Sequence, residues 1–513
     1  MVATSHPLAV SAGMEILKKG GNAIDAAVAT AAALTVVEPT SNGIGSDAFA
    51  IVWHEGALKG LNASGPAPET LTIEKAKSLG YGDVLPRFGW APATVPGAPA
   101  AWAELSRKMG RVSLEQTLAP AIELARGGHA VSVNASHLWA NALAAFSHLK
   151  TAEHRHWFET FCAGNRAPCP GERFVAPGHA YTLEQIASTN ARSFYEGEIA
   201  DRILAFSRET GGFYTEEDLA SFRPEWVDPI GVSYRGYDVW EIPPNGQGIV
   251  ALIALGILNR FQHEGHDCPY TIHRQIEAIK MGFADARTFV ADMKYGDIPV
   301  KELLSEAYAA RRASLIEEKA RDFAAGDPFG GGTVYLCTAD DQGNMVSYIQ
   351  SNYMGFGSAV VVPETGIALN NRGQCFSLDD SHRNALQPGK RPYNTIIPGF
   401  ITKDGEPVGP FGVMGAYMQP QGHVQVAMNC IDFHMNPQEA LDAPRWQWEG
   451  DLRVSCEPGF SNNIAQKLSR MGHNVRMAMH STDFGRGQMI CRTSGGTLVG
   501  ATEPRTDGTV GTW

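Results

Sequence analysis

The strongest constraint on the fold is a change of sequence pattern between Gly332 and Thr333. Before this point, segments with helical spacing of apolar residues predominate; after three consecutive glycines the chain reads "TVYLCTADDQGNMVSYIQS". "TVYLCTA" and "NMVSYIQS" contain residues typical of strands, and "DDQG" between them is typical of a hairpin turn. We therefore expect a helix-rich large part, residues 1–332, and a strand-rich small part, residues 333–513, that begins with a β-hairpin.

Apolar periodicity and turn residues predict the remaining elements. In the large part, the patterns predict helices over 6–21, 98–110, 113–128, 245–261, 271–292 and 300–325, and two strands over 48–56 and 231–244. A buried helix is expected over 23–37, with Asn22 as its N-cap and Asp25 in its first turn. In the small part, strands are expected over 359–369, 395–402 and 451–458, and helices over 423–435 and 461–472.

The "GGGT" stretch has two interpretations. It is either a flexible joint before a strand or the site of a nucleophile, and it is not a phosphate-binding P-loop because no GK[ST] follows at the required spacing. A threonine hydroxyl is a weak nucleophile that needs a base, and its own α-amine serves once the preceding bond is cut. Glycine before the threonine allows close approach to that bond because it has no Cβ. Gly332–Thr333 therefore fits an N-terminal nucleophile that generates itself by self-cleavage.

Net charge and apolar content argue against several other classes of protein. The net charge of -12 argues against nucleic-acid binding and against an anionic membrane surface. The apolar stretch 23–37 is too short to span a membrane, and "MVATSHPLAVSAG" lacks the basic and apolar regions of a signal peptide, so we expect a cytoplasmic protein. Eight cysteines without a CxxC pair are expected to be free thiols.

One cluster of potential metal ligands stands out in an irregular, Pro-rich segment, residues 147–178. His148, His154, His156 and Cys162 lie close together in sequence, but their spacing matches no zinc template. We expect a solvated surface loop there, and no metal or cofactor.

Several ordered motifs resemble the γ-glutamyltransferase family of N-terminal nucleophile (Ntn) hydrolases. These are the N-terminal 49 residues ending in "GIGSDAF", then "TVPGAPAAW", "AIKMGFADAR", and the block from Thr333 through "DDQGNMVS", "GIALNNRG", "PGKRPYNTIIP" and "DAPRW". The resemblance covers nearly the whole chain. It implies an α+β fold, a four-layer αββα sandwich formed jointly by both parts of a precursor that cuts itself between Gly332 and Thr333.

The resemblance also implies roles for particular residues. Thr333 would be the nucleophile, its α-amine the base, and Ser351, eighteen positions on, the hydroxyl that supports it. The backbone N–H groups of Gly415 and Ala416, in "VMGAYMQP", would form the oxyanion hole. Alanine replaces a family glycine there, which backbone donors tolerate if the local φ allows it.

The amino-acid pocket of the family is changed in this chain. Ser64 stands at the position of the carboxylate-binding arginine, and Arg372 and Cys375 stand where the family has acceptors for the α-amino group. Asn394 and Thr395 replace a serine pair. A cation at an ammonium-binding position disfavours an α-amino group, whereas Arg372 suits a carboxylate.

These changes indicate a compact amide that carries a carboxylate and lacks an α-amino group. Tyr353 is expected to narrow the pocket, and the substrate-binding set is then Arg372, Tyr353, Asn394 and Thr395. The alternative for Arg372 is a structural salt bridge to a neighbouring acid, such as Asp379 or Asp380. Within the family, "NRGxxFSLD" and "GxxQPQ" resemble the branch that contains oxamate amidohydrolase, so the expected reaction is oxamate plus water to oxalate plus ammonia.

Two alternatives remain open. One keeps the fold but changes the substrate, as a γ-glutamyl hydrolase or transpeptidase or a glutaryl-type (cephalosporin) acylase, which needs room beyond Tyr353 and a distant partner for the substrate carboxylate. The other is an uncleaved, inactive relative that serves as a binding protein. The expected partners are a small amide and the two parts of the precursor; homo-oligomerisation is open.

Overall fold

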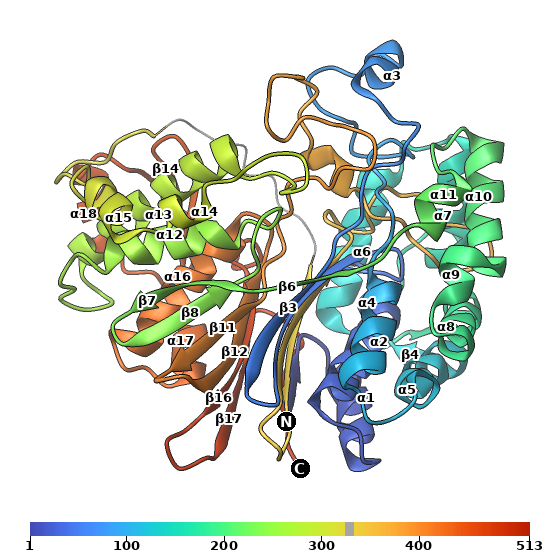
Figure 1. Ribbon diagram of the computed structural model, residues 1–513, viewed down its shortest axis with the longest axis horizontal. Helices are drawn as coiled ribbons and strands as arrows, with labels where there is room; N and C mark the ends of the chain where they lie inside the picture. Colours follow the sequence, from blue (N-terminus) through green and yellow to red (C-terminus); the bar gives the residue numbers. More distant parts are fainter. Residues whose placement is uncertain (324–332) are drawn as a thin grey trace.

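Two antiparallel sheets face each other at the centre of the molecule (Figure 1). The computed structural model describes residues 1–323 and 333–513. The first sheet has the strand order β18 (Thr509–Gly511), β1 (Val2–Thr4), β9 (Val334–Ala339), β10 (Met345–Ser351), β2 (Asp47–His54), β3 (Ala57–Ala63), β6 (Glu225–Val227). The second has the order β17 (Leu498–Thr502), β16 (Arg486–Arg492), β12 (Glu406–Met414), β11 (Gly399–Lys403), β8 (Tyr237–Glu241), β7 (Ile230–Tyr234).

Helices cover the outer face of each sheet (Figure 1). The first sheet carries α2 (Ala23–Val37) and α4 (Ala98–Met109), with α1 (Pro7–Lys18), α5 (Leu114–Gly127) and α8 (Pro177–Thr189) around them. The second sheet carries α12 (Gly248–Leu258) and α16 (Met418–Ile431), with α13 (Pro269–Phe289) and α17 (Pro437–Asp442) packed on them.

The other elements lie at the periphery. The other helices are α3 (Ile73–Ser78), α6 (Val133–Phe146), α7 (Arg155–Phe161), α9 (Arg192–Glu196), α10 (Glu198–Thr210), α11 (Glu216–Ala220), α14 (Val300–Leu303), α15 (Glu306–Ala313), α18 (Asn462–Arg470), and the 3-10 turns η1 (Ala152–His154) and η2 (Arg372–Cys375). Small sheets are formed by β4 (His129–Ala130) with β5 (Arg173–Phe174), and by β13 (Trp446–Gly450), β14 (Arg453–Cys456) and β15 (Asn474–Met477).

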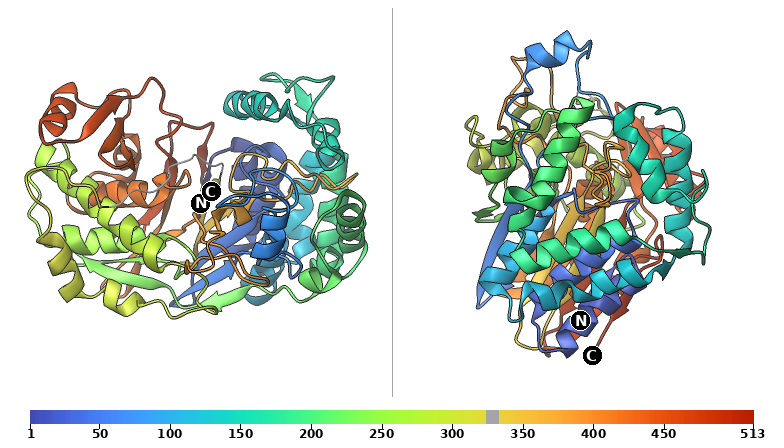
Figure 2. Two further views of the ribbon diagram at one scale, coloured as in Figure 1. Left: turned by 90° about the horizontal axis from the view of Figure 1, so that it is seen from above. Right: turned by 90° about the vertical axis from the view of Figure 1, so that its right-hand side faces the viewer.

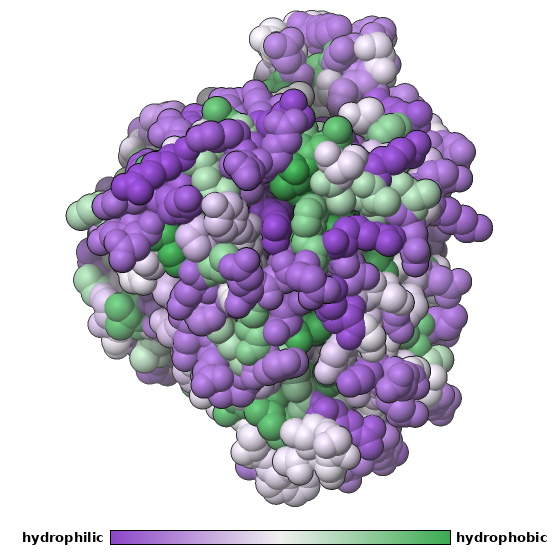
Figure 3. Space-filling model, turned by 90° about the vertical axis from the view of Figure 1, so that its left-hand side faces the viewer, coloured by the Kyte–Doolittle hydropathy of each residue, from purple (hydrophilic) through white to green (hydrophobic). Residues whose placement is uncertain are grey.

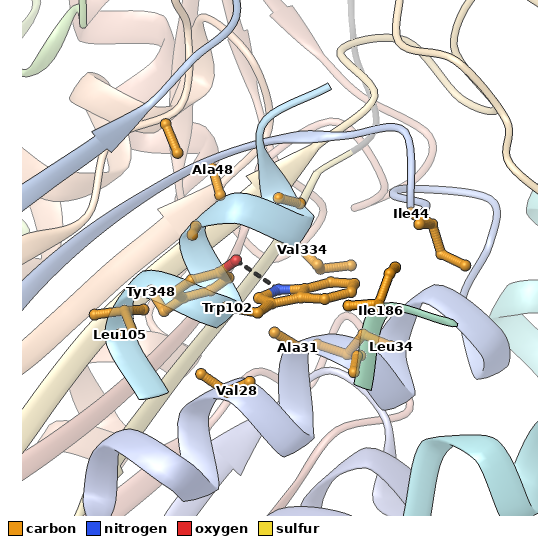
Figure 4. Packing of buried hydrophobic residues seen from close by; sticks show 14 of the residues in the cluster. Val28, Ala31, Leu34, Ile44, Ala48, Trp102, Leu105, Ile186, Val334 and Tyr348 are labelled. Atoms are coloured by element: carbon orange, nitrogen blue, oxygen red, sulfur yellow. Dashed lines mark hydrogen bonds between the residues drawn. The ribbon is translucent and has the colours of Figure 1, made fainter. Parts of the chain in front are cut away.

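The expected hairpin at the start of the small part is confirmed as β9 and β10. Every residue of both strands is buried, because α2 covers one face and β12 of the second sheet contacts the other. Val334 and Tyr348 lie beside Trp102 in this core (Figure 4), and the indole Nε1 of Trp102 donates to the Tyr348 hydroxyl at 2.9 Å. The sheets approach so closely that a Cβ at Gly412 would lie 2.4 Å from the ring of Tyr335.

Strands from both parts of the chain alternate within the sheets. β1 of the large part lies between β18 and β9 of the small part, and β8 pairs with β11. The two termini therefore lie side by side, as both Figure 1 and Figure 2 show. The expected capping of α2 is also confirmed, since Asn22 accepts hydrogen bonds from Ile24 N and Asp25 N.

Some expected elements were wrong in extent. The large part contains β1–β8 instead of two strands. A strand as short as β1, with three residues, leaves little pattern in the sequence. The 231–244 stretch folds back at Arg235 and Gly236 into the hairpin β7–β8. Both turn residues have positive φ (52° and 81°), as a tight hairpin turn requires. Residues 359–369 form isolated bridges instead of a strand.

Two more expectations need correction. The helix expected over 300–325 is two short helices, α14 and α15, because the Ser305 side chain caps α15 and the chain after Ser314 is irregular; residues 324 and 325 lie outside the described part. The segment expected to be a solvated loop contains α7, whose Trp157 and Phe161 are buried in an aromatic cluster.

The surface over α12–α18 is predominantly hydrophilic, with apolar residues scattered among polar ones (Figure 3). Within the described residues, none of the helices combines the length and apolar character needed to cross a bilayer.

Candidate active site

Thr333 lies at the entrance to β9, where the two sheets face each other. It is buried, with 1% of its surface exposed, and its Oγ1 is 3.0 Å from the Oγ of Ser351. The ladder explains this contact: Val334 pairs with Gln350, so Thr333 falls opposite Ser351 one step further along the hairpin. Burial of Val334 against Trp102 holds the beginning of the strand in place. Gly332 lies outside the described residues.

Ser351 is itself oriented by the backbone that follows it. Its Oγ accepts a hydrogen bond from the N–H of Tyr353 at 2.8 Å. Tyr353 has a φ of 75°, an uncommon conformation for a bulky residue, so the chain turns sharply as it leaves β10. The hydroxyl pair is therefore set by the hairpin register on one side and by this turn on the other.

Gly415 and Ala416 form a turn between β12 and α16. Their φ values are 140° and 50°, so alanine occupies the left-handed region, which costs about 1–2 kcal/mol. Gln247 stabilises the turn, since its Nε2 donates to Ala416 O at 2.9 Å. Among the described residues, neither amide N–H of this pair donates to a protein acceptor. Two free N–H groups just before a helix N-terminus can stabilise an oxyanion.

A cavity of about 400 Å³ opens beside this turn. Gly355, Met414 and Gly415 are among the residues that line it. Gly355 lies two residues after Tyr353, and Gly415 belongs to the turn of Gly415 and Ala416. Arg486 lines the same cavity because it pairs with Met414 across β12 and β16. Pockets of roughly 300–1,000 Å³ hold drug-sized ligands.

Both signs of charge line this cavity, through Arg87, Arg486, Glu449 and Asp483. Arg486 has one partner within ion-pair reach among the described residues, the buried Glu38, at a long 3.8 Å. Burial raises the pKa of Glu38, against the opposing effect of Arg486. Among the described residues, the Arg486 guanidinium therefore has no short ion pair.

Arg372 is paired with a residue that the sequence did not point to. Its Nε and Nη2 contact the two carboxylate oxygens of Asp47 at 2.9 and 3.2 Å, and both side chains are fully buried. Asp379 and Asp380, the partners considered from the sequence, are exposed and are not its partners. Burial alone would lower the pKa of Arg372, but Asp47 and other neighbours raise it, so the guanidinium stays charged.

The expected substrate-binding residues gather around this pair. Arg372 Nη1 donates to Thr395 Oγ1 at 2.7 Å, Asn394 Nδ2 donates to Asp47 at 2.7 Å, and the Tyr353 ring centre lies 4.7 Å from the Arg372 guanidinium. The carboxylate of Asp47 lies directly against the Arg372 guanidinium, so the expected repulsion between Arg372 and a substrate ammonium is offset inside the protein. An acid in the otherwise apolar stretch "DAFAIV" was the available signal for Asp47.

Ser64 and Cys375, at two further positions of the family pocket, interact with neighbouring residues of the protein. Ser64 Oγ donates to Asn62 Oδ1 at 2.7 Å and accepts from Asn245 Nδ2 at 3.1 Å. Burial raises the pKa of Cys375, against the effect of Arg372, so it is a neutral thiol. Neither residue offers a charge to a substrate.

The residues considered as a metal site from the sequence have separate contacts in the structure. His154 is buried and its Nδ1 contacts Ala359 O, and His156 pairs with Glu159. Burial raises the pKa of Cys162 to about 11, so it is not a ready thiolate ligand.

The comparisons with known proteins agree with this geometry. The pattern of the gamma-glutamyltranspeptidase family matches residues 9–513. A cephalosporin acylase from Bacillus halodurans is 55% identical, with a TM-score of 0.97 over 100% of this chain and 95% of its own. The glutathione hydrolase-like YwrD proenzyme of Bacillus subtilis (strain 168) is 38% identical, and the oxamate amidohydrolase proenzyme of Klebsiella pneumoniae is 35% identical; each alignment covers 99% of this chain and 97% of the relative.

The family pattern covers nearly the whole chain, and these relatives are named as hydrolases, amidohydrolases and acylases. The chain therefore belongs to the gamma-glutamyltranspeptidase family and is an Ntn-type hydrolase.

Proposed function

We propose that the protein is a self-processing amide hydrolase whose nucleophile is Thr333. The observation that carries the proposal is the buried contact of 3.0 Å between Thr333 Oγ1 and Ser351 Oγ at the start of β9. Cleavage before Thr333 would free its α-amine, which takes the hydroxyl proton as Oγ1 attacks the substrate carbonyl. The N–H groups of Gly415 and Ala416 would stabilise the oxyanion. The amine leaves with the proton, and water then releases the acid from the acyl-enzyme.

The proposed processing yields a large chain, residues 1–332, and a small chain, residues 333–513. The order of helices, sheet, sheet and helices supports the four-layer αββα sandwich of Ntn hydrolases as the shared unit. Because β1 lies between β18 and β9, the two chains would stay associated after the cut. Proenzyme names among the relatives support the same view.

For the substrate, we propose an amide with an acyl chain that ends in a carboxylate, of the glutaryl type. A longer acyl group needs room beyond Tyr353 and a distant cation, and the 400 Å³ cavity with Arg486 supplies both. Oxamate, with six non-hydrogen atoms, would fill about a quarter of this volume if it occupies the bulk of roughly three waters. The 55% identical cephalosporin acylase supports an acylase activity.

Oxamate hydrolysis is the second candidate. The observation that favours it is the compact cluster of Arg372, Tyr353, Asn394 and Thr395 close behind Ser351. Arg372 has five N–H donors; among the described residues Asp47 and Thr395 engage three and the Cys375 thiol also lies against the guanidinium, so at most two are left for a small carboxylate. The 35% identical oxamate amidohydrolase proenzyme supports this candidate.

A substrate panel on the processed protein separates the candidates. We expect glutaryl-p-nitroanilide to give a higher kcat/KM than γ-glutamyl-p-nitroanilide or oxamate, measured as amine or ammonia release. Arg486→Gln should raise KM for the glutaryl amide at least tenfold, while Arg453→Gln, an exposed arginine outside the cavity lining, should change nothing.

Other results of the same panel would contradict the glutaryl-type substrate. If oxamate is the best substrate and Arg486→Gln has no effect, the second candidate replaces the first. Faster release from the γ-glutamyl amide would contradict both, and a chain that stays whole and hydrolyses nothing would indicate the binding protein.

A further inference from the structure

A buried polar cluster lies on α13, away from the active site. The α13 cluster consists of His273, Glu277 and Lys280 together with His473 of the small part, and none of the four is more than 3% exposed. The spacing i, i+4, i+7 places the three helical residues on one face of α13. Lys280 Nζ contacts Glu277 Oε1 at 2.7 Å, and His273 Nδ1 contacts His473 Nε2 at 2.8 Å.

Polar atoms of His273, Glu277 and Lys280 hold one irregular stretch of backbone, residues 317–321. Arg321 N donates to Glu277 Oε2 at 3.1 Å, and Lys280 Nζ donates to Arg321 O at 2.9 Å, so both polar backbone groups of one residue are bound. His273 Nε2 contacts Glu317 O at 2.8 Å. The small part adds a backbone contact, Ala320 N to Met471 O at 2.7 Å.

A metal ion is a poorer explanation of this cluster. Two nitrogens on one tetrahedral zinc at 2.0–2.1 Å would lie roughly 3.3 Å apart, whereas the His273 and His473 nitrogens lie at hydrogen-bond distance. The Lys280 ammonium also forms an ion pair with the Glu277 carboxylate, which a metal ion would need as a ligand. With Nε2 of His273 donating to a carbonyl, its Nδ1 is the acceptor from His473, so both nitrogens of His273 are hydrogen-bonded, while Nδ1 of His473 has no partner among the described residues.

Stability does not explain the cluster either. A buried ion pair is often no more stabilising than apolar side chains of the same volume, because both charges lose their hydration. What apolar side chains could not replace are the hydrogen bonds to the N–H and C=O of Arg321. The cluster is therefore suited to fixing the position of this backbone.

The position of the stretch in the chain gives the cluster its role. Arg321 lies twelve residues before Thr333, and within the described part of the chain residues 317–321 are the last backbone ahead of Thr333 with hydrogen bonds to other elements. We propose that the α13 cluster positions the precursor for self-cleavage, by fixing the end of the large part against the small part. The inference rests on the proposed function, since it assumes a cut before Thr333. His273, Glu277, Lys280 and His473 are positioning residues in this scheme and touch no substrate.

The test separates positioning from stability. Lys280→Met removes the bond to Arg321 O and leaves Glu277 uncompensated, so both cleavage and thermal stability should fall. Glu277→Leu/Lys280→Met removes both charges; its melting temperature should recover, yet precursor cleavage should remain at least tenfold slower than in the natural chain. Cleavage is followed over time on denaturing gels, with N-terminal sequencing of the small fragment.

The matched control is Arg321→Met. This residue's side chain is exposed and, among the residues that the structure describes, pairs with Glu317, while its backbone carries the contacts to the cluster, so cleavage should be unchanged. The processed fraction of every variant should show the natural kcat/KM, because the cluster does not touch the active site. A double variant that cleaves at the natural rate overturns the inference. If the natural chain itself fails to cleave, the proposed function fails instead.

Discussion

Breaking the buried pair of Asp47 and Arg372 should destabilise the protein far more than breaking an exposed pair of equal length. Asp47→Asn or Arg372→Met leaves one fully buried charge without its partner, which costs about 3–5 kcal/mol. Asp47→Asn/Arg372→Met removes both charges at once. We expect the double variant to cost at least about 3 kcal/mol less than the sum of the two single changes.

The matched comparison is the pair of Lys59 and Asp228. Its atoms lie 3.0 Å apart, close to the 2.9 Å of the buried pair, but the two side chains are 50% and 89% exposed. Solvent screens such a contact, so Asp228→Asn should cost less than about 1 kcal/mol. The two pairs have similar lengths but differ in burial and in hydrogen bonding, since Asp47 meets two nitrogens of Arg372 and also accepts from Asn394, so the difference in cost measures both effects together.

Urea unfolding measures these differences. All variants are made in a Thr333→Ala background, in which we expect one uncut chain, so that a single polypeptide unfolds. The slopes of the unfolding curves should agree between variants, and the midpoints should carry the change in stability. Equal small costs for the buried and exposed pairs would refute the view that Asp47 neutralises Arg372 inside the protein, and would return Arg372 to the role of a free carboxylate ligand.

Three further predictions concern the nucleophile and the response to acid. Thr333→Ala should leave one uncut chain without amide hydrolysis, seen on a denaturing gel and by amine release; a cut at this bond in the variant contradicts the mechanism. Ser351→Ala removes the hydroxyl 3.0 Å from Thr333 Oγ1 and should lower kcat by roughly tenfold to a hundredfold, if the lost hydrogen bond is worth about 1.5–3 kcal/mol; a KM effect alone would argue otherwise. Burial lowers the pKa values of His6, His129 and His179 to about 4, so the unfolded chain binds protons first as pH falls. Stability should be complete above pH 6.5 and decrease towards pH 4, by up to about 3 kcal/mol per histidine; urea midpoints that do not change between pH 7 and 5 would contradict this reasoning.

Thr333 was singled out by the sequence pattern and Ser351 by the family resemblance, and the contact between them depends on local structure. A short turn closes the hairpin of β9 and β10, and the register then places Thr333 opposite Ser351 without help from distant residues. The capping of α2 by Asn22 is local in the same way. The residues of the oxyanion turn, Gly415 and Ala416, came from the family resemblance, and the structure adds the positive φ values of both.

Contacts between residues far apart in the sequence determine the features that the sequence did not predict. Asp47 and Arg372 are 325 residues apart, and only the assembly of both parts into one core brings the carboxylate to the guanidinium. A buried charge must find a partner, but nothing in the local sequence says which one, so Asp379 and Asp380 were reasonable and wrong. Residues 317–321 follow the same rule: local propensity favoured a helix, whereas Glu277, Lys280 and His273 bind their backbone in an irregular form. Thus the sequence alone determined the family and indicated the candidate nucleophile, while the tertiary structure determined how the buried charges are paired.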